Sequence, residues 1–254
     1  MKALRQTGFT LVEIAIVLVV IGLLLGGILK GQQLINSARV RNLADQNTSI
    51  QAAYYGFIDR FRNLPGDMTC ASAVSAIGAA ISTDNCSSND VGGNGNGRIE
   101  NVQEAAAVWA HLSVAGFLNG TFTGSLSTSD ATTYRSSGVP TGAIPPNAFQ
   151  GPIMLAHTSS YMNASSVTRL AYSFGGNIPV PILRDLDQKL DDGAAGTGVL
   201  RSGPKSGGSS PDTFDGIVNY TASGTSDDCV GGTAPNETWN VDSSNQNCNG
   251  VFLY

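Results

Sequence analysis

Glu13 is the residue whose chemistry is hardest to reconcile with its surroundings. It is the only ionisable side chain in the twenty-one residues from Phe9 to Leu29, FTLVEIAIVLVVIGLLLGGIL. About twenty apolar residues are enough to cross a bilayer as a helix, so this run predicts a membrane span. A carboxylate inside a membrane costs about 2.5 to 3.5 kcal/mol on insertion scales, and it persists where it gains a partner. Glu13 is therefore a candidate for an ion pair, with snorkelling toward the lipid headgroups as the alternative.

A second group of oxygen ligands lies in DVGGNGNGRIE, residues 90–100. Asp90, Asn94, Asn96 and Glu100 are candidate calcium ligands in this stretch. The two asparagines fall at the third and fifth positions of an EF-hand loop, but the first and twelfth positions lack the acids that such a loop uses. A tight turn that holds no ion is the competing interpretation.

A third candidate is the acidic stretch DLDQKLDDG, residues 185–193. Asp187 and Asp191 would share one face of a helix predicted from Ile182 to Asp192, with Gly193 ending that helix. Calcium ligation and an ordinary solvated acidic face both remain open for this stretch.

The four cysteines, Cys70, Cys86, Cys229 and Cys248, form no CxxC pair and lie near no histidine in the sequence, which argues against a zinc site. An even number of cysteines is typical of disulfides in an extracytoplasmic protein. Of the three possible connectivities, the two local pairs, Cys70 with Cys86 and Cys229 with Cys248, close the shortest loops. Four free buried thiols are the alternative.

Catalytic motifs are absent from the sequence. We find no GxSxG elbow, P-loop, HExxH or dinucleotide-binding fingerprint. The only two histidines are His111 and His157, and His111 beside Trp109 on a predicted helix is typical of a packed or surface side chain rather than of a base. The sequence therefore predicts a protein that is not an enzyme and needs no cofactor, with calcium as the one ion to test.

The N-terminus carries a resemblance to a known family. The leader MKALRQTG followed by FTLVEIAIVLVVIGLLL closely resembles the processing and anchor region of type IV prepilins and type II secretion pseudopilins. This resemblance implies that a prepilin peptidase cleaves between Gly8 and Phe9 and methylates the new N-terminus, which leaves a mature chain of 246 residues.

The same resemblance implies a partner for Glu13. Cleavage frees the α-amine of Phe9, and during filament assembly the amine of one subunit would pair with Glu13 of a neighbouring subunit. Gly22 and Gly26 form a GxxxG pair, which lets membrane helices approach closely. Glycine is also simply common in membrane helices, and that explanation stays open.

The membrane helix is predicted to continue to about Arg62. Apolar residues follow Lys30 at helical spacing, at Leu34, Ala38, Leu43, Ile50, Tyr54, Phe57 and Phe61. The sequence Leu64-Pro65-Gly66 then stops the helix. We divide the chain into a leader (residues 1–8), a membrane half of the helix (9–29), an amphipathic half (30–62) and a globular head (63–254).

The head is predicted to be a loop-rich antiparallel β-sheet with short helices, so the fold class is α+β and pilin-like. Short helices are expected at Ala71–Ala80 and Asn101–Ala115, the second ended by Gly116. The expected strands are Pro152–His157, Arg169–Phe174, Ile217–Thr221 and Val251–Tyr254. Residues 63–254 hold seven Lys and Arg against sixteen acids, which makes nucleic acid an unexpected partner for the head outside a DNA-uptake role.

The function that the sequence predicts is structural. By resemblance, this is a subunit of a type IV pilus or type II secretion pseudopilus, a fimbrial filament formed with other pilins, and its partners are the prepilin peptidase, an assembly ATPase and a platform protein. The resemblance also places it in the bacterial inner membrane, as a single pass with a periplasmic head, and afterwards in the pilus, the pseudopilus or at the cell surface. The alternatives are a minor, tip or adhesin-like pilin whose head binds a surface, DNA or a secreted protein, and a membrane-anchored periplasmic enzyme.

Overall fold

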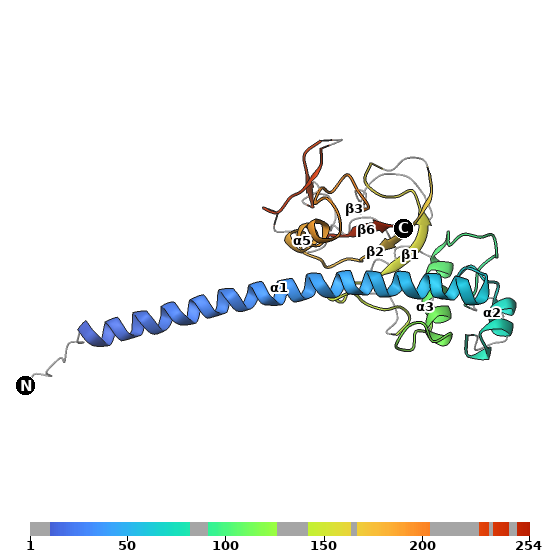
Figure 1. Cartoon of the computed structure of the whole chain (residues 1–254), viewed down its shortest axis with the longest axis horizontal. Helices are drawn as coiled ribbons and strands as arrows, with labels where there is room; N and C mark the ends of the chain where they lie inside the picture. The colour runs from blue at the N-terminus through green and yellow to red at the C-terminus, as the bar shows by residue number, and fades with distance from the viewer. Residues whose placement is uncertain are drawn as a thin grey trace, which may run out of the picture. The chain divides into compact units, whose positions relative to one another are not determined.

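The structure of the protein is a computed structural model that describes residues 11–81, 91–125, 142–163, 167–203, 229–233, 236–243 and 248–254 (Figure 1). The chain divides into two compact units, Met1–Arg39 and Val40–Tyr254. A single helix, α1 (Leu11–Phe61), contributes residues to both units.

The first part of α1, residues 11–29, is apolar on every side apart from Glu13, whereas the part within the second unit has one buried face. The buried residues of that face recur every three or four positions, at Val40, Leu43, Ala44, Asn47, Ile50, Ala53, Tyr54 and Phe57. The predicted helix is confirmed, and the apolar residues of its stripe are buried from Leu43 to Phe57. Leu34 and Ala38 are exposed, because both lie before the part of the helix that packs in the head.

The end of α1 follows the predicted stop signal. Arg62 has a positive φ of 55°, and the turn that follows contains Pro65 and Gly66. Gly66 has a φ of 87°, and a Cβ atom there would collide with the backbone oxygen of Glu104. Only glycine combines this conformation with so close an approach to another backbone.

Two short helical segments follow, α2 (Cys70–Ala76) and the 3₁₀ turn η1 (Ala79–Ile81). α3 (Val102–Val114) begins at Asn101, whose side-chain oxygen accepts the backbone N–H of Glu104 as an N-cap. Ten of its residues are buried, so this helix lies inside the head. It ends before Gly116, as predicted.

In the part of the chain that the structure describes, the main sheet has four antiparallel strands in the order β1-β2-β6-β3. They are β1 (Met154–Thr158), β2 (Arg169–Ser173), β6 (Gly250–Leu253) and β3 (Leu200–Ser202). A long helix followed by a small antiparallel sheet confirms the α+β class. Three of the predicted strands are present, β3 was not predicted, and the expected strand at 217–221 lies outside the described residues.

The last part of the head packs around α5 (Val180–Leu190), which begins two residues earlier than predicted because Pro179 and Pro181 suit the first turn of a helix. Near α5 a two-stranded sheet pairs β4 (Val230–Gly231) with β5 (Thr238–Trp239). The segment 229–248 that contains it is closed by a disulfide between Cys229 and Cys248.

Candidate functional site

The part of α1 before the head presents a continuous apolar surface. Every residue from Leu11 to Lys30 is exposed, and the most apolar eighteen-residue window has a mean hydropathy of 2.8 with none of it buried. By length and composition this helix can cross a membrane. An apolar surface of this size is not stable in water, so lipid or other protein has to cover it.

Glu13 lies in the first turn of α1. The N-terminal end of a helix carries a partial positive charge, which favours a carboxylate there. Gly8 and Phe9, the predicted cleavage and methylation site, lie outside the described residues, and the pairing of the Phe9 amine with Glu13 stays a prediction.

Gly22 and Gly26 lie one helical turn apart on the same side of α1. Among the described residues, a Cβ atom at either position would meet nothing within 4 Å. The role of these glycines in packing between helices stays a prediction.

The predicted calcium loop is built around a residue that the sequence analysis did not select, Asp67. Its carboxylate accepts backbone N–H groups from three residues of the loop: Gly95 at 2.9 Å, Asn96 at 3.1 Å and Gly97 at 2.7 Å. Asp67 is only 4% exposed. At this point the loop therefore presents hydrogen-bond donors to an anion, which is the opposite of the oxygen cage that a cation needs.

The proposed ligands of that loop are engaged in local hydrogen bonds. The side-chain oxygen of Asn94 accepts the backbone N–H of Asn96, and that of Asn96 accepts the N–H of Arg98, as in Asx turns. The amide nitrogen of Asn96 donates to Glu100 Oε1 at 2.5 Å. Asp90 lies outside the described residues, so calcium binding here stays a prediction, and the geometry of the other three residues is that of a tight turn.

A second buried carboxylate, Glu104, holds the same loop from the start of α3. It accepts the backbone N–H groups of Asn94 at 3.2 Å and Glu100 at 2.8 Å. Burial raises the pKa of Glu104, while these hydrogen bonds oppose the rise. The sequence signal that could have identified Asp67 is LPGDM, in which the acid directly follows the turn that ends α1.

Both histidines support backbone structure. Nδ1 of His111 accepts the N–H of Gly66 at 2.9 Å, and Nδ1 of His157 accepts the N–H of Ile99 at 2.9 Å. Burial lowers the pKa of His111 to about 4 and also lowers the pKa of His157. His111 is fully buried, so of the two predicted alternatives, a packed or a surface side chain, it is the packed one.

Of the two predicted local disulfides, the structure describes both cysteines of one pair and a single cysteine of the other. The Cys229–Cys248 disulfide is present, and Cys70 is also disulfide-bonded. Its predicted partner, Cys86, lies outside the described residues. Free thiols are therefore excluded for the three described cysteines.

Comparison with known proteins gives one match. Residues 4–29 match the family described as the prokaryotic N-terminal methylation motif, and this range contains Gly8, Phe9, Glu13, Gly22 and Gly26. No curated protein and no solved structure matches the chain. The match covers the same apolar segment that the structure leaves exposed on α1. The chain therefore carries the N-terminal methylation motif, which is the class III signal peptide of type IV pilins and pseudopilins.

Proposed function

We propose that this protein is a structural subunit of a type IV pilus or of a type II secretion pseudopilus. It is cleaved after Gly8, methylated at Phe9 and assembled through the first part of α1. The observation that carries the proposal is the combination found on this helix: an apolar surface exposed on all sides, with Glu13 as its single acid, inside the N-terminal methylation motif.

The position of Glu13 supports assembly through an ion pair between subunits. A carboxylate held in an apolar environment needs a counter-charge. Cleavage supplies one, because a free α-amine has a pKa of about 8 and is largely protonated at neutral pH. The amine of Phe9 lies four residues, about one helical turn, before Glu13 on the same chain. A neighbouring subunit that is shifted along the helix axis by this offset can place its own amine at Glu13.

The apolar surface of α1 supports a filament core. Both lipid and a bundle of identical helices cover apolar side chains, so leaving the membrane gains little from the hydrophobic effect itself. Packing between helices and the Glu13 ion pair then decide the equilibrium. Gly22 and Gly26 supply a flat face on which two helices can approach closely.

The test is a Glu13→Gln variant expressed in the native host, because glutamine keeps the size of the side chain and removes its charge. We expect the variant to be cleaved and methylated at Phe9, as mass spectrometry of membrane extracts would show, but to be absent from sheared filaments. Asp59→Asn is the matched control, since Asp59 is an acid on the same helix whose side chain is 81% exposed.

Two results would contradict the proposal. Recovery of Glu13→Gln in filaments at the wild-type level would show that the carboxylate does not direct assembly. A wild-type protein that begins at Met1 in every preparation from its host would show that the motif is not processed.

A further inference from the structure

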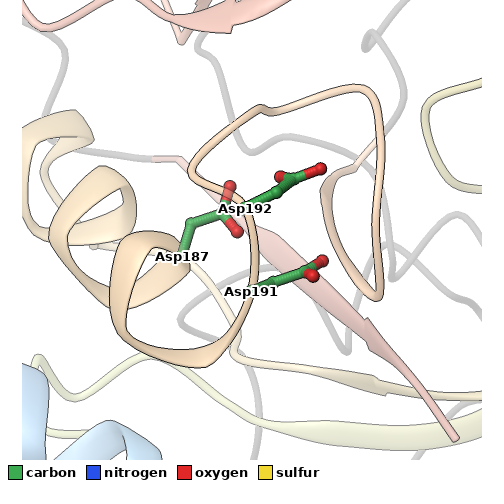
Figure 2. Close-up of side chains that lie close together, drawn as sticks. All are labelled: Asp187, Asp191 and Asp192. Atoms are coloured by element: carbon green, nitrogen blue, oxygen red, sulfur yellow. The ribbon is translucent and has the colours of Figure 1, made fainter.

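Three carboxylates meet at the C-terminal end of α5. Asp187 lies in the last turn of the helix, Asp191 is its C-cap residue and Asp192 follows directly. One carboxylate oxygen of each lies within 4.8 Å of the others. Figure 2 shows the three side chains extending on the same side of the helix end, beside the loop that leads to β3.

We propose that Asp187, Asp191 and Asp192 together bind one calcium ion. This site lies in the head, is distinct from the 90–100 loop, and does not depend on how α1 assembles.

The negative charge of the three acids favours the binding of a cation. The C-terminal end of a helix carries a partial negative charge, and three carboxylates placed there repel both that end and one another. Within the described residues, no lysine, arginine or histidine forms an ion pair with any of the three. Arg201 is close enough to lower the pKa of Asp192, after the larger effect of the Thr197 hydrogen bond.

Two nitrogens of Arg201 donate to backbone oxygens and not to the three carboxylates. Its Nε donates to the backbone oxygen of Gly198 at 2.9 Å, and one terminal nitrogen donates to the backbone oxygens of Met162 and Asn163. Its guanidinium also lies over the ring of Tyr161. These contacts hold the loops around the site, and the single positive charge of Arg201 does not balance three carboxylates.

The independent observation is an unsatisfied oxygen atom on Asp187. This residue has no exposed surface. Its Oδ2 accepts the indole N–H of Trp239 at 2.7 Å, but Oδ1 is buried and has no hydrogen-bond partner among the described residues. A buried carboxylate oxygen without a partner is rare, and a bound ion is one of its standard explanations.

The pKa of Asp187 is consistent with a carboxylate that is incompletely hydrogen-bonded. Burial raises it to about 6, with a further contribution from the neighbouring Asp192 and Asp191. The hydrogen bond from Trp239 and the nearby backbone N–H of Gly193 oppose the rise. Among the described residues, no hydrogen bond of normal geometry reaches Oδ1. A bound cation would offset both the cost of burying this carboxylate and its repulsion by the other two.

The other two carboxylates are held in fixed directions by the loop after α5. Oδ2 of Asp191 accepts the backbone N–H groups of Val199 and Leu200. Asp192 accepts the N–H of Ala194 at 2.8 Å and the hydroxyl of Thr197 at 2.6 Å. Such bonds orient metal ligands from the second shell of a site.

Gly198 allows this arrangement. It has a positive φ of 72°, and a Cβ atom there would overlap Oδ2 of Asp191. The backbone can therefore wrap closely around the carboxylate only with glycine at this position.

The ligand chemistry selects calcium. All three ligands are carboxylates, and the group contains no histidine or cysteine, which disfavours zinc. Calcium accepts six to eight oxygen ligands in flexible geometry, whereas magnesium demands near-octahedral geometry and gives up its waters reluctantly. Asp192 is exposed, so one side of the site is open to solvent and leaves room for coordinating water.

The test uses the full-length protein in detergent, first stripped with EDTA and dialysed into calcium-free buffer. Terbium, a luminescent substitute for calcium, is the probe, because Trp239 is hydrogen-bonded to Asp187 and can transfer excitation energy to a bound lanthanide. We expect saturable terbium luminescence that excess calcium abolishes and the same concentration of magnesium does not. Calorimetry with calcium chloride alone should give one equivalent per chain.

Asp191→Asn and Asp192→Asn each should weaken calcium binding by about tenfold or more, since affinity follows the number of charged ligands. Asp185→Asn is the matched control, because Asp185 is an exposed acid on the same helix whose partner is Arg184. It should bind as the wild type does. Circular dichroism of each variant checks that the head is folded.

The proposal would be overturned if calorimetry of the wild-type protein showed no binding at millimolar calcium. It would also be overturned if the folded Asp191→Asn and Asp192→Asn variants bound calcium as the wild type does, or if Asp185→Asn weakened binding as much as these two substitutions. Displacement of terbium by magnesium as effective as that by calcium would overturn the choice of calcium.

Discussion

The hydroxyl of Tyr254 donates a hydrogen bond to Oδ1 of Asn47 over 2.7 Å, and so joins the residue after β6 to α1. Asn47 is only 3% exposed. The ring of Tyr254 is also parallel to that of Tyr172 in β2, with the two planes 3° apart. The sheet and the second part of α1 are therefore linked by one residue at the end of the described chain.

Tyr254→Phe should destabilise the head by about 1 to 2 kcal/mol. The ring and its contact with Tyr172 remain, but the buried oxygen of Asn47 loses its donor. Thermal unfolding of the full-length protein in detergent, followed by near-ultraviolet circular dichroism, measures the change. Tyr55→Phe is the control, since Tyr55 is 52% exposed on the same helix, and equal effects of the two variants would contradict the assignment.

Acid should destabilise the head through His111. Its pKa is about 4 in the folded protein against 6.5 for an unperturbed histidine, because the folded protein buries the neutral ring. The unfolded chain binds the proton more readily, so the stabilisation is complete above pH 6.5 and is lost as the pH falls toward 4. The expected loss in the free energy of unfolding over this interval is about 3 kcal/mol.

The His111→Asn variant isolates this effect. An asparagine oxygen can take the place of Nδ1 as the acceptor for Gly66, but asparagine does not titrate. The variant should therefore be less stable at neutral pH, because it leaves a cavity beside Phe57, and its melting temperature should vary less between pH 6.5 and 4. An unchanged pH dependence would show that other groups cause the acid sensitivity.

Asp67→Asn should loosen the loop that follows residue 91. The carboxylate accepts three backbone N–H groups, and an amide presents one acceptor atom and one donor in their place. We expect a loss of about 2 kcal/mol together with faster hydrogen exchange at Gly95, Asn96 and Gly97. Asp59→Asn, on an exposed surface of α1, should leave both quantities unchanged.

The Cys229–Cys248 disulfide should resist reduction in the folded protein. Both cysteines are fully buried, so a mild reductant without denaturant should leave them unavailable to an alkylating reagent in mass spectrometry. Replacing both by serine should lower the free energy of unfolding by about 3 kcal/mol, because the bond closes a loop with a sequence separation of 19 residues. Rapid alkylation under native conditions would contradict the burial of this bond.

Local sequence patterns predicted most of the secondary structure, because the responsible residues lie close together in the chain. The end of α1 follows from the turn at Pro65 and Gly66, and α3 follows from the spacing of its apolar residues between Asn101 and Gly116. The N-terminal motif is also local, and residues 4–29 suffice to show it. Weak or very short elements were missed, including β3, which has three residues.

By itself, the sequence determined the signal peptide, the apolar helix with its single acid, and the α+β class of the head. Only the tertiary structure decided that β6 lies between β2 and β3, that Asp67 organises a loop about thirty residues away, and that Trp239 holds Asp187 across a separation of 52 residues. Helical periodicity and turn signals act over a few residues and can be read directly. The partner of a buried carboxylate depends on how distant segments pack, and no local pattern encodes that.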